Sequence, residues 1–316
     1  MTQPYRQLDL PPADGGPEQP ERRQLLTALI SCAAGLMIGT PGFAQARSGS
    51  SLQGRVSDLE KKLRARGLIG ANEKTSWSVY DFTTRTKLVA INEEAPRQAA
   101  SMIKPFVAQA YFFQVDGSKG KLKYTDDIRR TMESMIRRSN NPATNRIIDL
   151  VSRRAGGKGP SDVERVLKAK APGIFVQTRV VERIPEGGRT YRNLASARDY
   201  SRFLYALWND QLPYAAELRR IMALPKRDRM AHSVEAIPSN VRVYHKTGST
   251  AQLCGDMGII QAEGPGGARF PYTFIGIIER PSRTTDFASW IKRRGDAIRA
   301  VSELVYLDQR QRHRLA

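Results

Sequence analysis

Strand-like segments near the two ends of this chain, separated by a long helical stretch, constrain its fold most strongly. Near the start, Trp77–Phe82 and Thr86–Ile91 read as the two strands of a hairpin joined by a polar turn. Near the end, three further segments follow at Val241–Tyr244, Met257–Gln261 and Tyr272–Ile278, with a glycine-rich turn between the last two. We therefore expect the early and late strands to join in one antiparallel sheet.

The helical segments predict how this sheet is covered. Ser51–Arg66 carries a stripe of leucine and valine at helical spacing, and the amphipathic segment Asp286–Val305 closes the chain. We expect these terminal helices to cover one face of the sheet. The fold class is then α+β, with a sheet lobe at about 51–100 and 235–308, a helical lobe at about 101–234, and a cleft between them. The lobe's helices are expected at Ser101–Phe113, Asp126–Arg138, Asn145–Arg154, Ser161–Lys168 and Ser196–Trp208.

Residues 1–46 have the pattern of a cleavable export signal. Arg22-Arg23 provides the positive start, an apolar run covers Leu25–Ile38, and small residues precede the expected cleavage site after Ala46. The run is shorter than the roughly 20 residues that cross a bilayer comfortably, although an uncleaved membrane anchor is an alternative. We expect residues 47–316 to form the folded domain, in the periplasm or secreted.

Two details leave the export route open. The paired arginines also fit a twin-arginine signal. Leu29 to Cys32 resembles a lipoprotein cleavage box, but the residues after Cys32 stay apolar, whereas a lipid-anchored chain usually continues as a polar tether. We favour cleavage after Ala46. The remaining cysteine, Cys254, then has no partner for an internal disulfide and is expected to be a small buried residue.

The chain carries a formal net charge of +20, from 51 Lys and Arg against 31 Asp and Glu. A strongly basic balance often indicates nucleic-acid binding. Here the basic residues are scattered and the aromatic residues form no stacking platform, so we expect no nucleic-acid partner. Electrostatic association with an anionic cell envelope, or simply a solvated basic surface, explains the charge. We expect a monomer.

Three short motifs carry the chemistry: S-M-I-K from Ser101, S-N-N from Ser139 and K-T-G from Lys246. Each is weak alone, but the three together, in this order and in an exported chain, are specific. A serine hydroxyl is a poor nucleophile until a neighbouring base accepts its proton. Positions i and i+3 share one face of a helix, so Ser101 and Lys104 can touch. Pro105 suits the first turn of a helix and puts Ser101 near its N-terminus, where free N–H groups favour an oxyanion.

The other two motifs complete the candidate site. A lysine acts as a base only if its pKa falls, which burial and the nearby positive charge of Lys246 would favour. Ser139 is a candidate proton shuttle to the leaving nitrogen, and Asn141 a clamp for an amide. The alternative for S-N-N is a plain loop that caps the following helix. Thr247 supplies a hydroxyl, Gly248 admits close substrate approach, and the backbone N–H of Ser249 is the expected second oxyanion donor.

Histidines and two further polar residues are candidates for other roles. His232, His245 and His313 are far apart and lack metal-ligand spacing, so we expect no metal and no other cofactor. Strand alternation would turn His245 to the face opposite Lys246. Arg242 and Thr250 are candidates for binding a substrate carboxylate, and an ordinary strand role explains them equally well.

From about residue 51 to 308, the chain resembles the class A β-lactamases and related penicillin-binding serine hydrolases. The resemblance implies a serine acyl-enzyme mechanism, in which Ser101 attacks an amide or β-lactam carbonyl and the acyl group passes to water or an amine. There are departures: the segment between Lys104 and Ser139 is shorter, which would leave an open cleft, and Asn140 stands where those enzymes carry Asp. Beside the motifs, the supporting stretches are Gln98-Ala99-Ala100, Asn141-Pro142-Ala143-Thr144-Asn145 and Gly255-Asp256-Met257-Gly258.

The resemblance also implies a deacylating glutamate on a loop within 179–193, which contains Glu182 and Glu186. Neither lies in the family's E-x-x-L-N pattern. We select Glu182 because of its position in the loop. A surface carboxylate paired with Arg179 or Arg183 is the alternative.

Three functions follow as hypotheses. The first is β-lactam hydrolysis through acyl-Ser101, with Glu182 activating the deacylating water. The second is a D,D-peptidase that acts on peptidoglycan stem peptides and is acylated by penicillins without rapid release. The third is a non-hydrolytic module that binds muropeptide or β-lactam, which would not need an activated serine.

Overall fold

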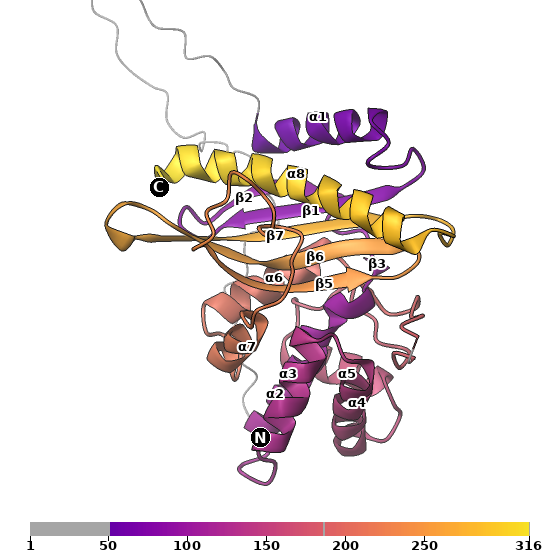
Figure 1. Ribbon diagram of the computed structural model, residues 1–316. Coiled ribbons are helices and arrows are strands. Elements are labelled where there is room, and N and C mark those ends of the chain that lie inside the picture. The colour runs from indigo at the N-terminus through magenta and orange to yellow at the C-terminus, as the bar shows by residue number, and fades with distance from the viewer. Residues whose placement is uncertain (1–50, 186, 316) are drawn as a thin grey trace, which may run out of the picture.

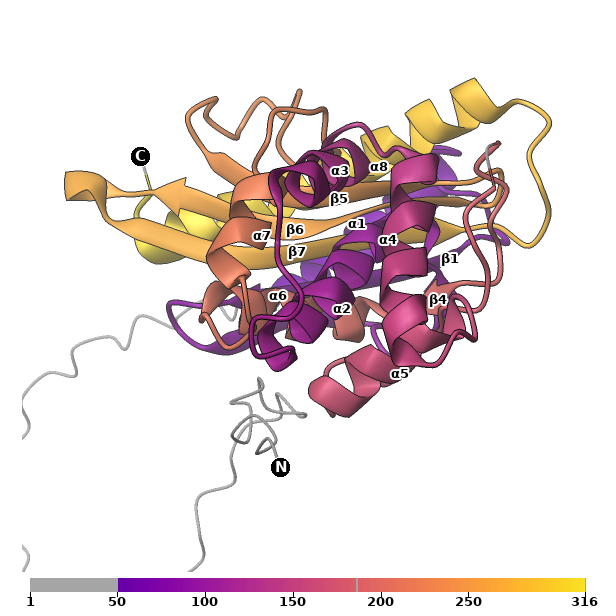
Figure 2. The same ribbon diagram turned by 90° about the horizontal axis from the view of Figure 1, so that it is seen from below.

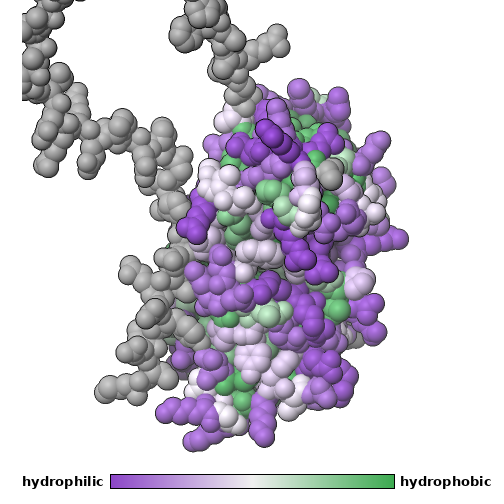
Figure 3. Space-filling view, turned by 90° about the vertical axis from the view of Figure 1, so that its left-hand side faces the viewer, coloured by the Kyte–Doolittle hydropathy of each residue, from purple (hydrophilic) through white to green (hydrophobic). Residues whose placement is uncertain are grey.

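The structure is a computed structural model that describes residues 51–185 and 187–315. The predicted export signal, with Cys32, and Glu186 lie outside the described residues. Within those two ranges, no helix is both long and apolar enough to span a membrane. The face in Figure 3 is largely hydrophilic, with hydrophobic residues scattered among the polar ones.

Five antiparallel strands form the central sheet, in the order β2-β1-β7-β6-β5 (Figure 1). The early hairpin thus pairs with the late strands, as predicted, through the β1–β7 ladder, in which Trp77 lies opposite Gly276. β5 is an edge strand, which leaves one side of it available to the site described below. The strands are β1 (Lys74–Asp81), β2 (Thr86–Ile91), β5 (Arg242–Ser249), β6 (Leu253–Glu263) and β7 (Arg269–Glu279).

One face of the sheet is covered by α1 (Leu52–Ala65) and α8 (Phe287–His313), as expected for the terminal helices. Their apolar residues share a buried core with the sheet: Val56 of α1 and Ile298 of α8 are fully buried in it together with Trp77. The N-cap of α1 is Ser51, whose hydroxyl accepts a hydrogen bond from the Gly54 N–H, so this helix begins where its capping chemistry predicts.

The remaining helices form a second lobe on the opposite face (Figure 2). Its core is α2, which is buried along almost its whole length, so its lack of a polar face is explained by neighbours on all sides. This confirms the predicted α+β arrangement. The helices are α2 (Lys104–Gly117), α3 (Asp126–Arg137), α4 (Asn141–Ala155), α5 (Ser161–Lys170), α6 (Ala197–Trp208) and α7 (Ala215–Met222).

Several elements differ from the sequence expectation. The helix expected from Ser101 begins as a separate 3₁₀ turn, η1 (Ala100–Ile103), and the α-helix starts only at Lys104. A small ladder of β3 (Arg97–Gln98) and β4 (Leu194–Ala195) and helix α7 were not predicted, while the expected glycine-rich turn contains a short 3₁₀ turn, η2 (Pro265–Gly267). These elements are too short for hydrophobic periodicity to reveal them.

Candidate active site

Ser101 lies on η1, between the two lobes, and is half-buried. Ala100, directly before it, has a φ of 44°, which is unusual for a residue with a side chain. This strained turn is followed by Pro105 in the first turn of α2, where its missing N–H costs nothing. The nucleophile predicted from the sequence is therefore presented on a tight turn ahead of the helix.

Close packing holds η1 against β5 and β6. A Cβ placed on Gly248 would lie 2.9 Å from Cγ of Met102, and one on Gly255 would lie 2.8 Å from its Cε. A larger residue at either glycine would displace the turn that carries Ser101. Gly248 thus allows η1 to pack closely against β5. Its expected role in admitting the substrate stays a prediction.

Lys104 is fully buried beneath the site. Its Nζ lies 2.5 Å from the carbonyl oxygen of Ser139, 3.0 Å from Ser139 Oγ and 2.9 Å from Asn141 Oδ1. Burial lowers the pKa of Lys104 to about 7. Near pH 7, Lys104 is then neutral in a large fraction of the molecules and can accept a proton. The structure thus brings the first and second motifs together.

The second motif is also a helix cap. The Asn140 side chain accepts a hydrogen bond of 2.7 Å from the Ala143 N–H and caps α4, while Ser139 has a φ of 54°. Asp and Asn are both good N-caps, so Asn140 can perform this task where class A enzymes carry Asp. The capping interpretation is thus confirmed, and the same turn brings Ser139 and Asn141 into hydrogen-bond contact with Lys104, so the catalytic interpretation stays compatible with it as a prediction.

Lys246 is almost fully buried on β5, and its Nζ donates to the carbonyl oxygen of Thr247 at 3.0 Å. Burial holds its pKa well below the ordinary lysine value, and the nearby charges of Lys104 and Lys226 lower it further. The third motif thus lies close enough to the first for Lys104 to affect the pKa of Lys246. The predicted effect of Lys246 on Lys104 is not seen, because burial alone accounts for the lowered pKa of Lys104. Thr247 is half-buried beside it.

Arg229 is a site residue that the sequence analysis missed. Its guanidinium donates to Ser249 Oγ at 2.6 Å and to the carbonyl oxygens of Gly248 and Gly255 at 3.1 and 2.7 Å. It comes from the irregular segment between α7 and β5 and belongs to no motif, so only the tertiary fold reveals it. It places a guanidinium beside the serine that follows the K-T-G motif.

Glu182 is engaged by its own loop. Its Oε1 accepts hydrogen bonds from Thr190 Oγ1, Tyr191 N and Arg192 N at 2.6, 2.7 and 2.9 Å. Burial opposes ionisation, but these hydrogen bonds outweigh it and hold the pKa of Glu182 below its usual value. In the described part of the chain, no hydrogen bond joins it to Ser101 or a motif residue.

The expected arginine partners of Glu182 also lie elsewhere. Arg183 forms an ion pair with Asp149 instead. The Arg179 backbone N–H donates to Leu194 O, next to the β3–β4 ladder. Glu182 is therefore better described as a carboxylate that shapes the loop than as a surface charge.

Behind the site, on the face of β5 opposite Lys246, His245 Nδ1 lies 3.1 Å from Asp256 Oδ1. Both are buried. Asp256 Oδ2 also accepts a hydrogen bond from the backbone N–H of Arg229 at 2.7 Å. This carboxylate therefore ties β5, β6 and the Arg229 segment together.

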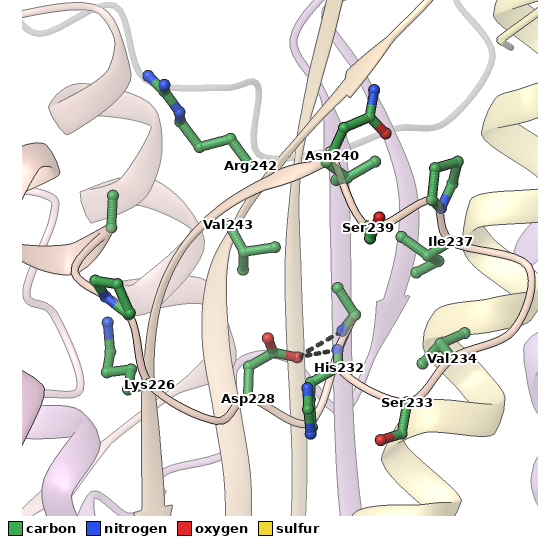
Figure 4. A pocket seen from close by; sticks show the side chains of 15 residues that line it. Lys226, Asp228, His232, Ser233, Val234, Ile237, Ser239, Asn240, Arg242 and Val243 are labelled. Atoms are coloured by element: carbon green, nitrogen blue, oxygen red, sulfur yellow. Dashed lines mark hydrogen bonds between the residues drawn. The ribbon is translucent and has the colours of Figure 1, made fainter.

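The two further candidates for a carboxylate site are separated. Thr250 donates to Gln98 Oε1 at 3.0 Å and so joins the end of β5 to β3. Arg242 lies at the other end of β5, on the rim of a cavity of about 600 Å³ that also contains Lys226 (Figure 4). The Asp228 side chain in that cavity accepts hydrogen bonds from the backbone of its own loop.

Comparison with known proteins agrees with this geometry. The model of the β-lactamase enzyme family matches residues 58–130 and 117–299. This chain belongs to the β-lactamase enzyme family. No curated protein sequence matches the chain.

Cys254 is buried, as expected from the sequence, and this burial raises the pKa of its thiol to about 11.

Solved structures share the β-lactamase fold at low sequence identity. PBP-A is 20% identical with a TM-score of 0.62, covering 81% of this chain and 97% of its own. An ancestral class A β-lactamase (GNCA) is 19% identical with a TM-score of 0.62, covering 82% and 100%. A β-lactamase from Desulfarculus baarsii is 16% identical with a TM-score of 0.65, covering 83% and 99%. A mutant of PBP-A is described as an acyl-enzyme complex with penicillin G.

Proposed function

We propose that this member of the β-lactamase family forms an acyl-enzyme on Ser101 with the carbonyl carbon of an amide or β-lactam. The observation that carries the proposal is the buried Lys104, with a pKa of about 7 and hydrogen bonds to Ser139. The Ser101 oxygen attacks the carbonyl carbon while its proton passes to neutral Lys104. The C–N bond then breaks, and the leaving nitrogen takes a proton through the Ser139 hydroxyl.

The remaining site residues would orient the substrate. Arg229, Thr247 and Lys246 suit a substrate carboxylate, because two cations and a hydroxyl gather around the end of β5. Asn141 would bind the amide of the acyl group. The backbone N–H groups of Ser101 and Ser249 are the proposed oxyanion donors.

Two fates of the acyl-enzyme remain as candidates. Rapid β-lactam hydrolysis requires a base that activates water, and Glu182 was predicted for that role. Three hydrogen bonds already saturate one of its oxygens within the loop. This observation counts against Glu182 as that base, whereas Glu186, the other glutamate of the loop, lies outside the described residues. It supports the second candidate, a D,D-peptidase acting on peptidoglycan stem peptides, whose β-lactam adduct would be long-lived. A purely binding module is disfavoured, because it needs no activated serine and therefore gives no reason to bury the ammonium group of Lys104, which costs free energy of folding.

Intact-mass spectrometry at successive times after addition of benzylpenicillin tests the proposal. We expect a covalent adduct of one ligand mass that is absent in Ser101→Ala and present in the matched control Ser161→Ala, an exposed serine at the start of α5. A lasting adduct indicates the peptidase, and drug loss with at most a transient adduct indicates a β-lactamase. Labelling of Ser101→Ala would contradict the assignment of the nucleophile.

We also propose export through residues 1–46, with the folded domain in the periplasm or secreted. The apolar run after Arg22-Arg23 supports export, and the net charge of +20 supports association with an anionic envelope. Fractionation of cells that produce the tagged protein, with N-terminal sequencing of the product, tests both the compartment and cleavage after Ala46.

A further inference from the structure

The side of the site next to Asn141 is bordered by an arginine-bearing loop. The Asn141 Nδ2 donates to the carbonyl oxygen of Pro185 at 3.2 Å, and a Cβ placed on Gly188 would lie 3.6 Å from the same nitrogen. If Asn141 binds the acyl amide, as in the proposed function, the side chain of the acyl group extends out of the site past Gly188. Arg189 and Arg192 follow directly on this loop, and both side chains are exposed.

A second loop brings another arginine to the same place. Arg283, in the connection from β7 to α8, stacks on the ring of Tyr191, with its Cζ 4.6 Å from the ring centroid. This connection is fastened to the turn after β5, because the Thr284 N–H donates to Ala251 O at 2.9 Å. In Figures 1 and 2 both loops lie at the same end of the sheet. Arg189, Arg192 and Arg283 therefore lie on two loops that meet at Tyr191, and the first of these loops borders Asn141.

The described carboxylates of these loops have hydrogen-bond or ion-pair partners other than the three arginines, and only Glu182 lies near one of them, Arg192. Glu182 accepts three hydrogen bonds from its own loop, and Asp286 caps α8 through the Ser289 N–H. Glu279 forms an ion pair with Arg97. Within the described residues, neither Arg189 nor Arg283 forms a salt bridge, whereas the charge of Arg192 helps to lower the pKa of Glu182. A guanidinium is a planar donor that suits carboxylates, so an anionic group is the complementary ligand.

We propose that the Arg189, Arg192 and Arg283 rim selects substrates that carry a carboxylate in the acyl group, beyond the amide held by Asn141. This inference rests on the proposed acylation of Ser101 and specifies its substrate class. The substrate has two negative ends: one carboxylate on the leaving side near Arg229, and a second on the acyl side. A stem peptide with an acidic residue before the scissile bond has this chemistry, as does a penicillin with a carboxylated side chain.

Two penicillins provide matched probes, since benzylpenicillin and its α-carboxy derivative differ by one carboxylate on the acyl side chain. The acylation rate constant of each is measured by quenched intact-mass spectrometry at low salt, and their ratio is compared between variants. In Arg189→Gln/Arg192→Gln we expect the preference for the carboxylated compound to fall about three- to tenfold, the range for two exposed ion pairs. The same preference should shrink in wild-type protein when salt is raised to about 0.5 M.

The matched control is Arg153→Ala, an exposed arginine in the last turn of α4, about 18 Å along the helix from Asn141. It should retain the wild-type ratio. An unchanged ratio in the double variant, or an equal fall in the control, overturns the inference while acylation itself stands. Failure of both penicillins to label wild-type protein would instead overturn the proposed function.

Discussion

Burial of the Lys104 ammonium predicts that its removal stabilises the fold while abolishing acylation. The pKa of Lys104 falls from 10.5 to about 7 on folding. At about 1.4 kcal/mol per pKa unit, burying the charged form destabilises the folded state by about 5 kcal/mol. Lys104→Met keeps the volume and removes the charge. It leaves acceptors on Ser139 and Asn141 without a donor, but both residues are half-exposed to water, so we assign a loss of about 1–3 kcal/mol.

The net gain near pH 7 is then about 2–4 kcal/mol, and its pH dependence is the sharper test. In wild type the folded pKa lies below the unfolded pKa, so the unfolded chain binds more protons between pH 7 and 10.5. Wild-type stability therefore rises with pH through this window, and Lys104→Met lacks that rise. The advantage of the variant should fall by about 3 kcal/mol between pH 7 and pH 9.5.

Urea unfolding followed by tryptophan fluorescence measures both quantities. Lys121→Met, at an exposed lysine, is the matched control and should show no such pH-dependent difference. A stability difference between Lys104→Met and wild type that stays constant from pH 7 to 9.5 would refute the reasoning. So would a variant that is less stable at every pH, because the charge of Lys104 would then cost nothing on folding.

Four further predictions concern the site. Acylation of wild-type protein by benzylpenicillin should rise with pH through about 7 and then level off, because neutral Lys104 accepts the serine proton; a flat profile from pH 5.5 to 8.5 in quenched mass spectrometry would exclude it as the base. Glu182→Gln should leave the adduct lifetime unchanged, since its carboxylate is bound within the loop; a longer lifetime would identify it as the deacylating base. Arg229→Ala should raise the half-saturating penicillin concentration at least about tenfold through loss of a charge-assisted hydrogen bond, and an unchanged value would remove it from the carboxylate site. Asp256→Asn should cost about 3 kcal/mol in urea unfolding, because His245 and Arg229 lose a buried charged partner, and a loss below about 1 kcal/mol would contradict this.

The parts of the fold that the sequence predicted are those with long periodic patterns. The pairing of Trp77–Phe82 and Thr86–Ile91 with the late strands followed from strand alternation and from the need of every strand for a partner. The strand bounds were less accurate: β6 runs over Leu253–Glu263, well beyond the expected Met257–Gln261, because its residues are buried on both faces and do not alternate. Short elements such as α7 carry too few residues for a pattern to emerge.

At the candidate site, the sequence predicted residues that belong to motifs and not Arg229, whose contacts depend on tertiary position. Ser101, Lys104 and Lys246 could be found because each has a fixed spacing to a partner of complementary chemistry. Arg229 could not, since its contact with Ser249 depends on an irregular segment that folds back from the end of α7. Glu182 was selected from its position in a loop, but its hydrogen-bond partners depend on how that loop closes.

The two interpretations offered for the second motif, a helix cap and a catalytic group, are one physical arrangement. The left-handed turn at Ser139 and the cap supplied by Asn140 fix the start of α4. Fixing that point also fixes Ser139 and Asn141, the two residues that hold Lys104. Local capping chemistry thus determines where the buried lysine finds its acceptors, and burial of that lysine lowers its pKa. A turn whose own stability comes from capping can hold a buried lysine at low pKa without relying on the interactions of that lysine.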